Sequence, residues 1–170
     1  MHKIKHRHAY LSILLVFFIQ VLLSNFLAFS PFRPNLLIII TFFFALFTDE
    51  KFAFKTGLLS GILLDIFSIR FLGLNTFLFS FSSYIIGKYN HKFYKDSIIT
   101  HVILTFMMSF FILSVYFLFV NLHSPSIPRI GLNIIFSPLI LIPSLFNSFL
   151  GIWIYAFFLR IFRLSESTLD

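Results

Sequence analysis

The chain has 170 residues, of which 59% are hydrophobic and 11% charged, and its mean hydropathy is +0.98. A soluble domain is about 45–50% apolar and about 25% charged, so this composition excludes an ordinary water-soluble fold and favours an integral membrane protein. The absence of cysteine excludes disulfides, thiolate metal sites and thiol nucleophiles. The net charge of +7 comes from short basic clusters between apolar runs, a pattern that is typical of membrane topology rather than of nucleic-acid binding.

Six apolar segments follow one another along the chain, at 9–29, 35–47, 56–69, 71–87, 98–120 and 139–159. A spanning helix needs about 20 residues, which the first, fifth and sixth segments reach. The segments 35–47 and 56–69 are short enough to bend back instead of crossing. The turn 48–55 between them carries four charged residues, which are costly to bury in lipid. We therefore expect two full spans, extended by the snorkelling side chains of Arg33, Lys51 and Lys55.

The distribution of Lys and Arg predicts the orientation in the membrane. With the N-terminus in the cytoplasm, ten of the thirteen basic residues are cytoplasmic and three lie outside. This bias follows the positive-inside rule. The cytoplasmic set is Lys3, Lys5, Arg7, Lys51, Lys55, Lys88, Lys92, Lys95, Arg160 and Arg163, and the outer set is Arg33, Arg70 and Arg129.

The sequence thus predicts an all-α integral membrane protein, a compact bundle of six transmembrane helices with both ends in the cytoplasm. Residues 1–8 form a basic cytoplasmic tail, residues 9–163 a single transmembrane domain, and residues 164–170 a cytoplasmic C-terminal tail. The histidines and lysines of the basic tail are expected to contact anionic lipid rather than a metal ion.

Small residues mark one face of the third and fourth segments. Gly57, Gly61 and Asp65 are spaced four apart, so they share a face of the predicted helix 56–69, and the two glycines allow another helix backbone to approach closely. In the segment 71–87 a second face is formed by Gly73, Thr76, Ser80, Ser83 and Gly87. We expect an antiparallel hairpin in which these faces meet and Asp65 contacts Asn75, Thr76 or Ser80.

Asp65 has two interpretations. An ionisable residue within a membrane often belongs to a proton or ion pathway. Alternatively, Asp65 is a buried structural group, either protonated or paired with Arg70. A relay usually needs several titratable groups in sequence, and Asp65 is the only acidic residue outside the predicted cytoplasmic regions. We therefore favour the structural role and keep transport as the alternative.

The sixth segment contains the stretch PSLFNSFLG, in which Pro143, Asn147 and Gly151 are four apart. Proline inside a helix predicts a kink and a freed backbone carbonyl. The simpler interpretation is a kinked packing helix with Asn147 hydrogen-bonded inside the bundle. The alternative is the wall of a ligand cavity or of a partner groove.

Patterns of catalytic and metal-binding residues are missing from the sequence. No two histidines, or His with Asp or Glu, have the spacing of metal ligands. The motifs GxSxG, HExxH and GxxxxGK[ST] do not occur, and the spans contain no paired aspartates. We expect neither an enzyme nor a cofactor.

The order of these features resembles the MreD family of rod shape-determining membrane proteins. The stretches RPNLLIIITFFFALF, KTGLLSGILLDIFSIRFLGLNTFLFSFSSYIIGK and IPSLFNSFLGIWIYAFFLRIFR carry the resemblance, which covers residues 9–163. Its most specific residues are Gly57, Gly61, Asp65, Gly73 and Asn75. Asn35 departs from the pattern, because the family often has an acidic residue at that position.

The resemblance implies a non-catalytic membrane scaffold of the bacterial cell-wall elongation (rod) complex in the inner membrane, which maintains cell shape. The implied partners are MreC first, then MreB, RodA and a class B penicillin-binding protein, together with membrane lipid and without nucleic acid. The architecture is similar to the six-helix substrate-binding component of energy-coupling-factor vitamin transporters. A small-molecule carrier of that kind is the alternative function.

Overall fold

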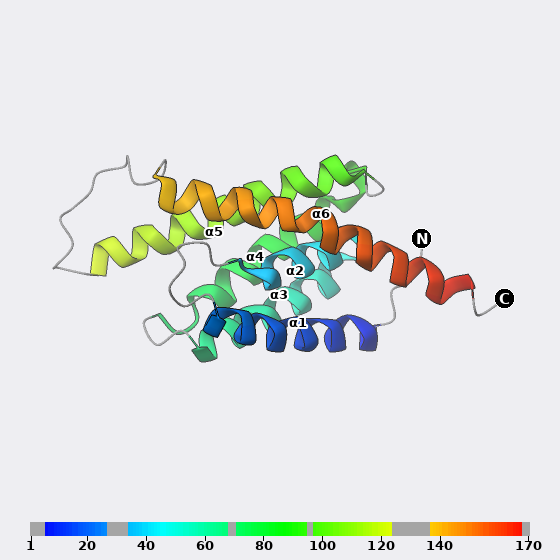
Figure 1. Ribbon diagram of the computed structural model, residues 1–170, viewed down its shortest axis with the longest axis horizontal. Coiled ribbons are helices and arrows are strands. Elements are labelled where there is room, and N and C mark those ends of the chain that lie inside the picture. The colour runs from blue at the N-terminus through cyan, green and yellow to red at the C-terminus, as the bar shows by residue number, and fades with distance from the viewer. Residues whose placement is uncertain (1–5, 27–33, 68–70, 95–96, 124–136, 168–170) are drawn as a thin grey trace.

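The computed structural model describes residues 6–26, 34–67, 71–94, 97–123 and 137–167. Within these ranges the chain forms six α-helices and one 3-10 turn and contains no strand (Figure 1). The elements are α1 (His6–Phe26), α2 (Leu36–Phe47), α3 (Glu50–Phe67), α4 (Leu74–Tyr89), η1 (Asn90–Lys92), α5 (Ile98–His123) and α6 (Pro138–Ser167). Each apolar segment of the sequence therefore corresponds to one helix.

The two largest differences from the predicted helix boundaries lie at the start of α3 and at the end of α6. The turn predicted at 48–55 is wrong, because α3 already begins at Glu50. The Asp49 carboxylate accepts a hydrogen bond from Phe52 N at 3.4 Å, as a helix N-cap residue does, and Glu50 in the first turn suits the helix dipole. At the C-terminus α6 continues to Ser167, so the predicted tail 164–170 is partly helical.

Three helices are long and apolar enough to cross a membrane, over Arg7–Ser24, Ile98–His123 and Pro138–Phe158. The helix α2 is apolar but has only 12 residues, which rise about 18 Å against a hydrocarbon core of about 30 Å. The helix α3 carries four charged residues, Glu50, Lys51, Lys55 and Asp65. Length and composition alone therefore account for three spans among the described residues.

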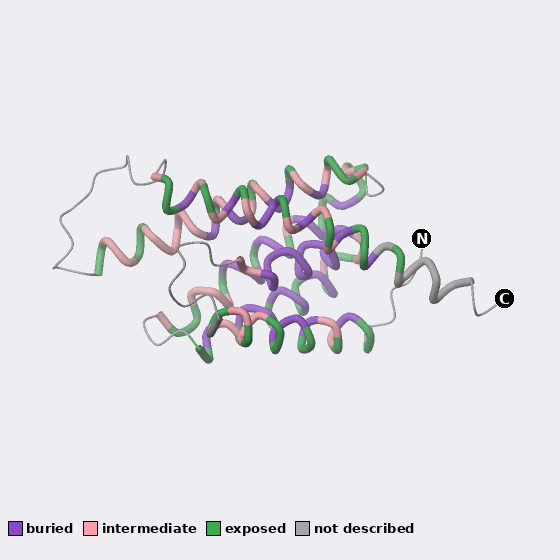
Figure 2. The backbone as a smooth tube through the Cα atoms, in the orientation of Figure 1, coloured by how far each residue is buried: buried purple, intermediate pink, exposed green. Residues whose placement is uncertain are grey.

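The short helix α2 occupies the centre of the molecule. Every residue from Leu36 to Leu46 is buried, and the helix contacts each of the other five helices. Figure 1 shows α1 along one side of it and the pair α5 and α6 along the other, and Figure 2 shows the buried backbone concentrated on α2. A helix that is apolar around its whole circumference is expected in a core, which explains why α2 shows no polar face.

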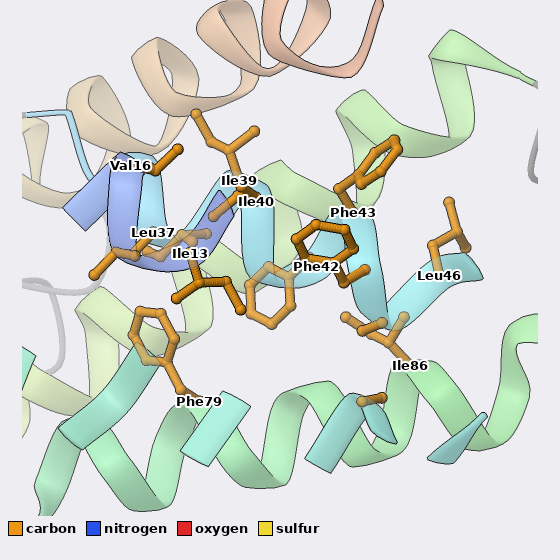
Figure 3. Packing of buried hydrophobic residues seen from close by; sticks show 14 of the residues in the cluster. Ile13, Val16, Leu37, Ile39, Ile40, Phe42, Phe43, Leu46, Phe79 and Ile86 are labelled. Carbon is orange, nitrogen blue, oxygen red and sulfur yellow. The ribbon is translucent and has the colours of Figure 1, made fainter. Parts of the chain in front are cut away.

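Aromatic and branched aliphatic side chains fill the space around α2. Ile13 of α1 and Phe79 of α4 lie on one side of the helix, and Ile39 points toward the opposite side (Figure 3). The rings of Phe42 and Phe79 stack with centroids 6.3 Å apart, and the ring of Phe43 lies 5.8 Å from that of Tyr155 on α6. The core is therefore built by five helices that surround a sixth.

The outer faces of the bundle are apolar, whereas many interior residues are polar. Large apolar side chains that are more than half exposed include Leu11 and Phe18 on α1, Ile99 on α5 and Leu145 on α6. The buried polar side chains include ten serines and threonines, among them Thr41 and Ser60, which join α2 to α3 by a hydrogen bond of 2.6 Å. This distribution, with large apolar side chains outside and polar side chains inside, suits lipid as the surrounding solvent.

The basic residues that the structure describes gather at one end of the bundle. The helix α1 begins and α6 ends at this end, and α5 begins there (Figure 1). Asn90 Nδ2 donates a hydrogen bond to Thr48 O, which brings the α2–α3 turn against η1. Lys3, Lys5 and Lys95, and all three arginines of the predicted outer set, lie outside the described residues.

Candidate functional site

The carboxylate of Asp65 is the acceptor of five hydrogen bonds from the start of α4. Its Oδ2 atom accepts from Gly73 N (3.0 Å), Thr76 N (2.9 Å) and Thr76 Oγ1 (2.6 Å), and its Oδ1 atom accepts from Asn75 N (3.2 Å) and Asn75 Nδ2 (3.0 Å). The side chain is 5% exposed. Asp65 therefore closes the α3–α4 hairpin at the end where the two helices are joined.

This arrangement makes Asp65 a helix cap supplied by a neighbouring helix. The first backbone N–H groups of a helix have no partner within it, and the helix dipole favours a negative charge there. The N-cap position of α4 is Gly73, which has φ +90° and no side chain to accept these bonds. Of the three expected partners, Asn75 and Thr76 contact the carboxylate, whereas Ser80 Oγ donates to Thr76 O at 2.6 Å. Arg70 lies outside the described residues.

Glycines bring the backbones of α3 and α4 into close contact. A Cβ atom on Gly57 would lie 2.5 Å from Phe79 O, and one on Gly61 would collide with the Cα of Thr76. Near the other end of the hairpin, a Cβ atom on Gly87 would lie 2.6 Å from that of Ala53. Since backbone atoms form most of these contacts, no side-chain rotation can make room, and the seam depends on the missing side chains.

A second polar cluster holds the start of α2. Asn147 Oδ1 on α6 accepts from Asn35 N at 2.9 Å, and Asn147 Nδ2 donates to Ser109 Oγ on α5 at 3.3 Å. Asn35 Oδ1 accepts from Ile38 N at 3.3 Å, and Gln20 Oε1 on α1 accepts from Leu37 N at 3.0 Å. Amide side chains from α1, from α6 and from the cap position thus accept hydrogen bonds from backbone N–H groups at the start of α2.

Sequence reasoning missed Gln20 and Asn35 as members of this cluster. Gln20 is an amide inside an apolar run, and an isolated amide in such a run needs a buried partner. Asn35 precedes a continuous apolar helix, which is the position that a capping residue occupies. Both signals are present in the sequence, but the partners come from helices that are distant along the chain.

Replacing Asn147 by leucine should destabilise the protein, because the N–H of the half-buried Asn35 would lose its acceptor. We expect Asn147→Leu to cost about 1–3 kcal/mol of unfolding free energy, which is a fall of about 3–10 °C in the thermal midpoint of the detergent-solubilised protein. The matched control is Asn121→Leu, since Asn121 Nδ2 donates only to Phe117 O of its own helix. Equal midpoints for the two variants would contradict a role of Asn147 in joining helices.

The other two candidates on α6 differ in their surroundings. Gly151 faces α5 and α2, and a Cβ atom there would lie 3.8 Å from His101 and from Ile39, which is ordinary van der Waals contact. Pro143 is half-buried, and α6 continues through it. A kink at Pro143 stays a prediction.

His101 on α5 is fully buried, and its ring contacts residues of α6 and α2. Its ring stacks on that of Tyr155 at 4.6 Å and meets Phe43 edge-on at 6.2 Å, and neither ring nitrogen has a hydrogen-bond partner among the described residues. A buried polar group without a partner is destabilising.

The substitution His101→Phe retains the ring contacts and removes both unpaired nitrogens. We expect the stability to stay unchanged or to rise by about 1–2 kcal/mol, measured as the thermal midpoint in detergent. The companion variant Tyr155→Leu, which deletes the stacked ring, should lower the midpoint. A clear loss of stability in His101→Phe would show that the imidazole has a polar partner in the native protein.

No group of three or more His, Asp or Glu residues that could hold a metal ion is found in the described part of the chain.

The sequence matches the family model of the rod shape-determining protein MreD over residues 3–161. The chain belongs to the MreD family. This confirms the resemblance drawn from the sequence. No curated protein and no solved structure matches the chain.

Membership of the MreD family assigns the chain a role in rod-shape determination as a membrane protein of the rod-shape complex. The family is a structural one and is not known as a family of enzymes. The sequence stretch that carries the resemblance most specifically forms the α3–α4 seam, with Gly57, Gly61 and Asp65 on one helix and Gly73 and Asn75 at the start of the other.

Proposed function

We propose that this MreD-family protein is a non-catalytic scaffold of the cell-wall elongation complex in the bacterial inner membrane, and that it binds MreC. MreB, RodA and a class B penicillin-binding protein are the further members of the proposed complex. The observation that supports this function is the use of the polar residues inside the fold. Asp65 and Asn147 are both engaged in hydrogen bonds that join helices, so neither is left to serve a transport pathway or a reaction.

For the topology we propose six passes with both ends in the cytoplasm, and the division into tail 1–8, membrane domain 9–163 and tail 164–170. Two observations support it. The helix α1 begins and α6 ends at the same end of the bundle (Figure 1), which an even number of passes requires. The short α2 is covered by the other helices, so its length need not match the hydrocarbon thickness.

For the candidate residues we propose a packing role inside the bundle. Gly57, Gly61, Asp65, Gly73 and Asn75 would hold α3 against α4, and Pro143, Asn147 and Gly151 would shape α6 where it meets α2 and α5. The partner surface is then formed by the exposed apolar faces. Association within lipid rests on close packing and a few polar contacts, because apolar burial provides little driving force there.

The small-molecule carrier receives less support. A six-helix carrier related to the vitamin-transporter components would hold its ligand between the helices. In this protein the centre is filled by α2, whose Phe42, Phe43 and Phe44 side chains are all buried against the surrounding helices.

The scaffold is tested by affinity purification of the tagged chain from membranes that contain MreC. We expect MreC to co-purify in a fixed ratio, and we expect cells depleted of the chain to lose rod shape and regain it when the wild type is restored. Rod shape that persists without the chain, or a failure of MreC to co-purify, would contradict the proposal. The topology is tested with reporter fusions, where a periplasmic signal at residue 92 would overturn the orientation.

A further inference from the structure

The outward side of the α3–α4 hairpin carries a groove of about 790 Å³. Its walls are mostly large apolar side chains that the chain itself leaves uncovered, with Phe77 64% exposed, Phe81 46% and Phe54 41%. The groove is lined by Lys51, Phe54, Lys55, Leu58, Gly73, Thr76, Phe77, Ser80, Phe81 and Tyr84. The groove borders the glycine contacts between the two helices, because Thr76 lines the groove and its backbone also packs against Gly61.

Two polar side chains along the groove already donate hydrogen bonds within the protein. Thr76 Oγ1 donates inward to Asp65, and Ser80 Oγ donates to Thr76 O. The rings of Phe77 and Phe81 stack in parallel with centroids 5.9 Å apart. Over most of its length the groove therefore offers only hydrocarbon and ring surface to an occupant.

Positive charge is confined to one end of the groove. Lys51 and Lys55, which are both exposed, lie one turn apart on α3, and the Lys88 ammonium lies 5.9 Å from the ring of Tyr84. Two acidic residues are near in sequence: Asp49, whose carboxylate accepts from Phe52 N, and Glu50. Neither Lys51 nor Lys55 is paired with an acidic side chain within the described residues.

We propose that this groove binds one anionic glycerophospholipid of the surrounding membrane, with its phosphate at Lys51 and Lys55 and an acyl chain along Leu58, Phe77 and Phe81. Ammonium groups at a membrane surface attract anionic headgroups, and the rest of the groove is apolar like the chain. The volume falls in the range of about 300–1,000 Å³ in which proteins hold small molecules. The site requires only that this face meets lipid, so it stands or falls independently of MreC binding.

A partner transmembrane helix fits the groove less well. Helices approach one another in lipid through small residues, and here the glycines of α3 are already buried against α4. The exposed walls are formed by phenylalanine, leucine and tyrosine instead. A helix with its side chains is about 10–12 Å wide, whereas a lipid chain is a narrow and flexible occupant.

The test is native mass spectrometry of the purified full chain, titrated in detergent with dioleoyl phosphatidylglycerol or with dioleoyl phosphatidylcholine. The two lipids share their acyl chains and differ in headgroup charge. We expect one phosphatidylglycerol to bind about tenfold more tightly than phosphatidylcholine. The double variant Lys51→Gln, Lys55→Gln should lose this preference. The variant Leu58→Trp fills the groove and should weaken the binding of both lipids.

The matched control is Lys92→Gln combined with Arg160→Gln, because both residues are exposed, basic and outside the groove. This control should retain the preference for phosphatidylglycerol, and all variants should keep the helix content of the wild type. Equal binding of the two lipids by the wild type would overturn the proposal. A control that loses the preference as completely as the lysine variant would also overturn it, since general surface charge would then explain the binding.

A photoreactive benzoylphenylalanine in place of Phe81 distinguishes a lipid from a protein occupant in native membranes. We expect an adduct of lipid mass on the full chain. A protein-sized adduct at this position, without a lipid adduct, would overturn the assignment and identify the groove as a protein interface.

Discussion

Replacing Asp65 by alanine is expected to be the most damaging single substitution in the α3–α4 hairpin. The change leaves three backbone N–H groups and two side-chain donors of α4 without their acceptor. The carboxylate is buried and four of its five donors belong to the half-buried residues Asn75 and Thr76. We therefore expect a loss of about 3–5 kcal/mol in unfolding free energy, and a fall of about 10 °C or more in the thermal midpoint in detergent. The variant Asp65→Asn retains one acceptor oxygen, so its loss of unfolding free energy should be about half as large.

The control for this prediction is Asp49→Ala. Asp49 is also an aspartate at a helix start, but it is exposed and accepts a single long hydrogen bond from Phe52 N. Its loss should cost no more than about 1 kcal/mol. A variant Asp65→Asn that keeps wild-type stability yet fails to restore rod shape would contradict the capping role and support a proton relay instead.

Adding a single methyl group at Gly61 should force α3 and α4 apart. In Gly61→Ala the new Cβ would overlap Thr76 Cα and lie 2.8 Å from Asn75 O, and both atoms belong to the backbone. Overpacking of this kind costs about 1–3 kcal/mol. We expect a lower thermal midpoint and weaker restoration of rod shape, and Gly61→Leu should be more severe.

Gly151→Ala is the matched control, because it is the same change on another buried helix face. The nearest atoms there lie 3.8 Å from the added carbon, and alanine favours a helix over glycine by about 1 kcal/mol. We therefore expect this variant to be as stable as the wild type or slightly more stable. Equal destabilisation of the two variants would mean that the tight contact at Gly61 does not set the hairpin geometry.

The sequence alone located the helices well, because each is a continuous apolar run bounded by polar residues. Four-residue spacing also placed Gly57, Gly61 and Asp65 on one helix face, and all three lie against α4 in the structure. Such patterns are local, so they can be read without knowing how the chain folds.

One error concerned a local signal, and the others arose where distant residues determine the structure. The charged stretch after α2 looked like a turn, yet Asp49 caps a helix that begins there. The central position of α2 was not predicted either, since a short apolar helix has the same composition whether it faces lipid or protein. The contacts that satisfy its first turn come from Gln20 and Asn147, which lie far apart in the sequence.

The enclosure of α2 has a consequence for biosynthesis. Its walls come from helices made before it and after it, and the last of them is α6. Until Asn147 has been synthesised, the Asn35 N–H lacks its acceptor. The ring of Phe43 on α2 likewise lacks its contacts with Tyr155 and Phe158. The core around α2 is therefore incomplete until α6 has been made, so a chain truncated before α6 should be a substrate for membrane proteases.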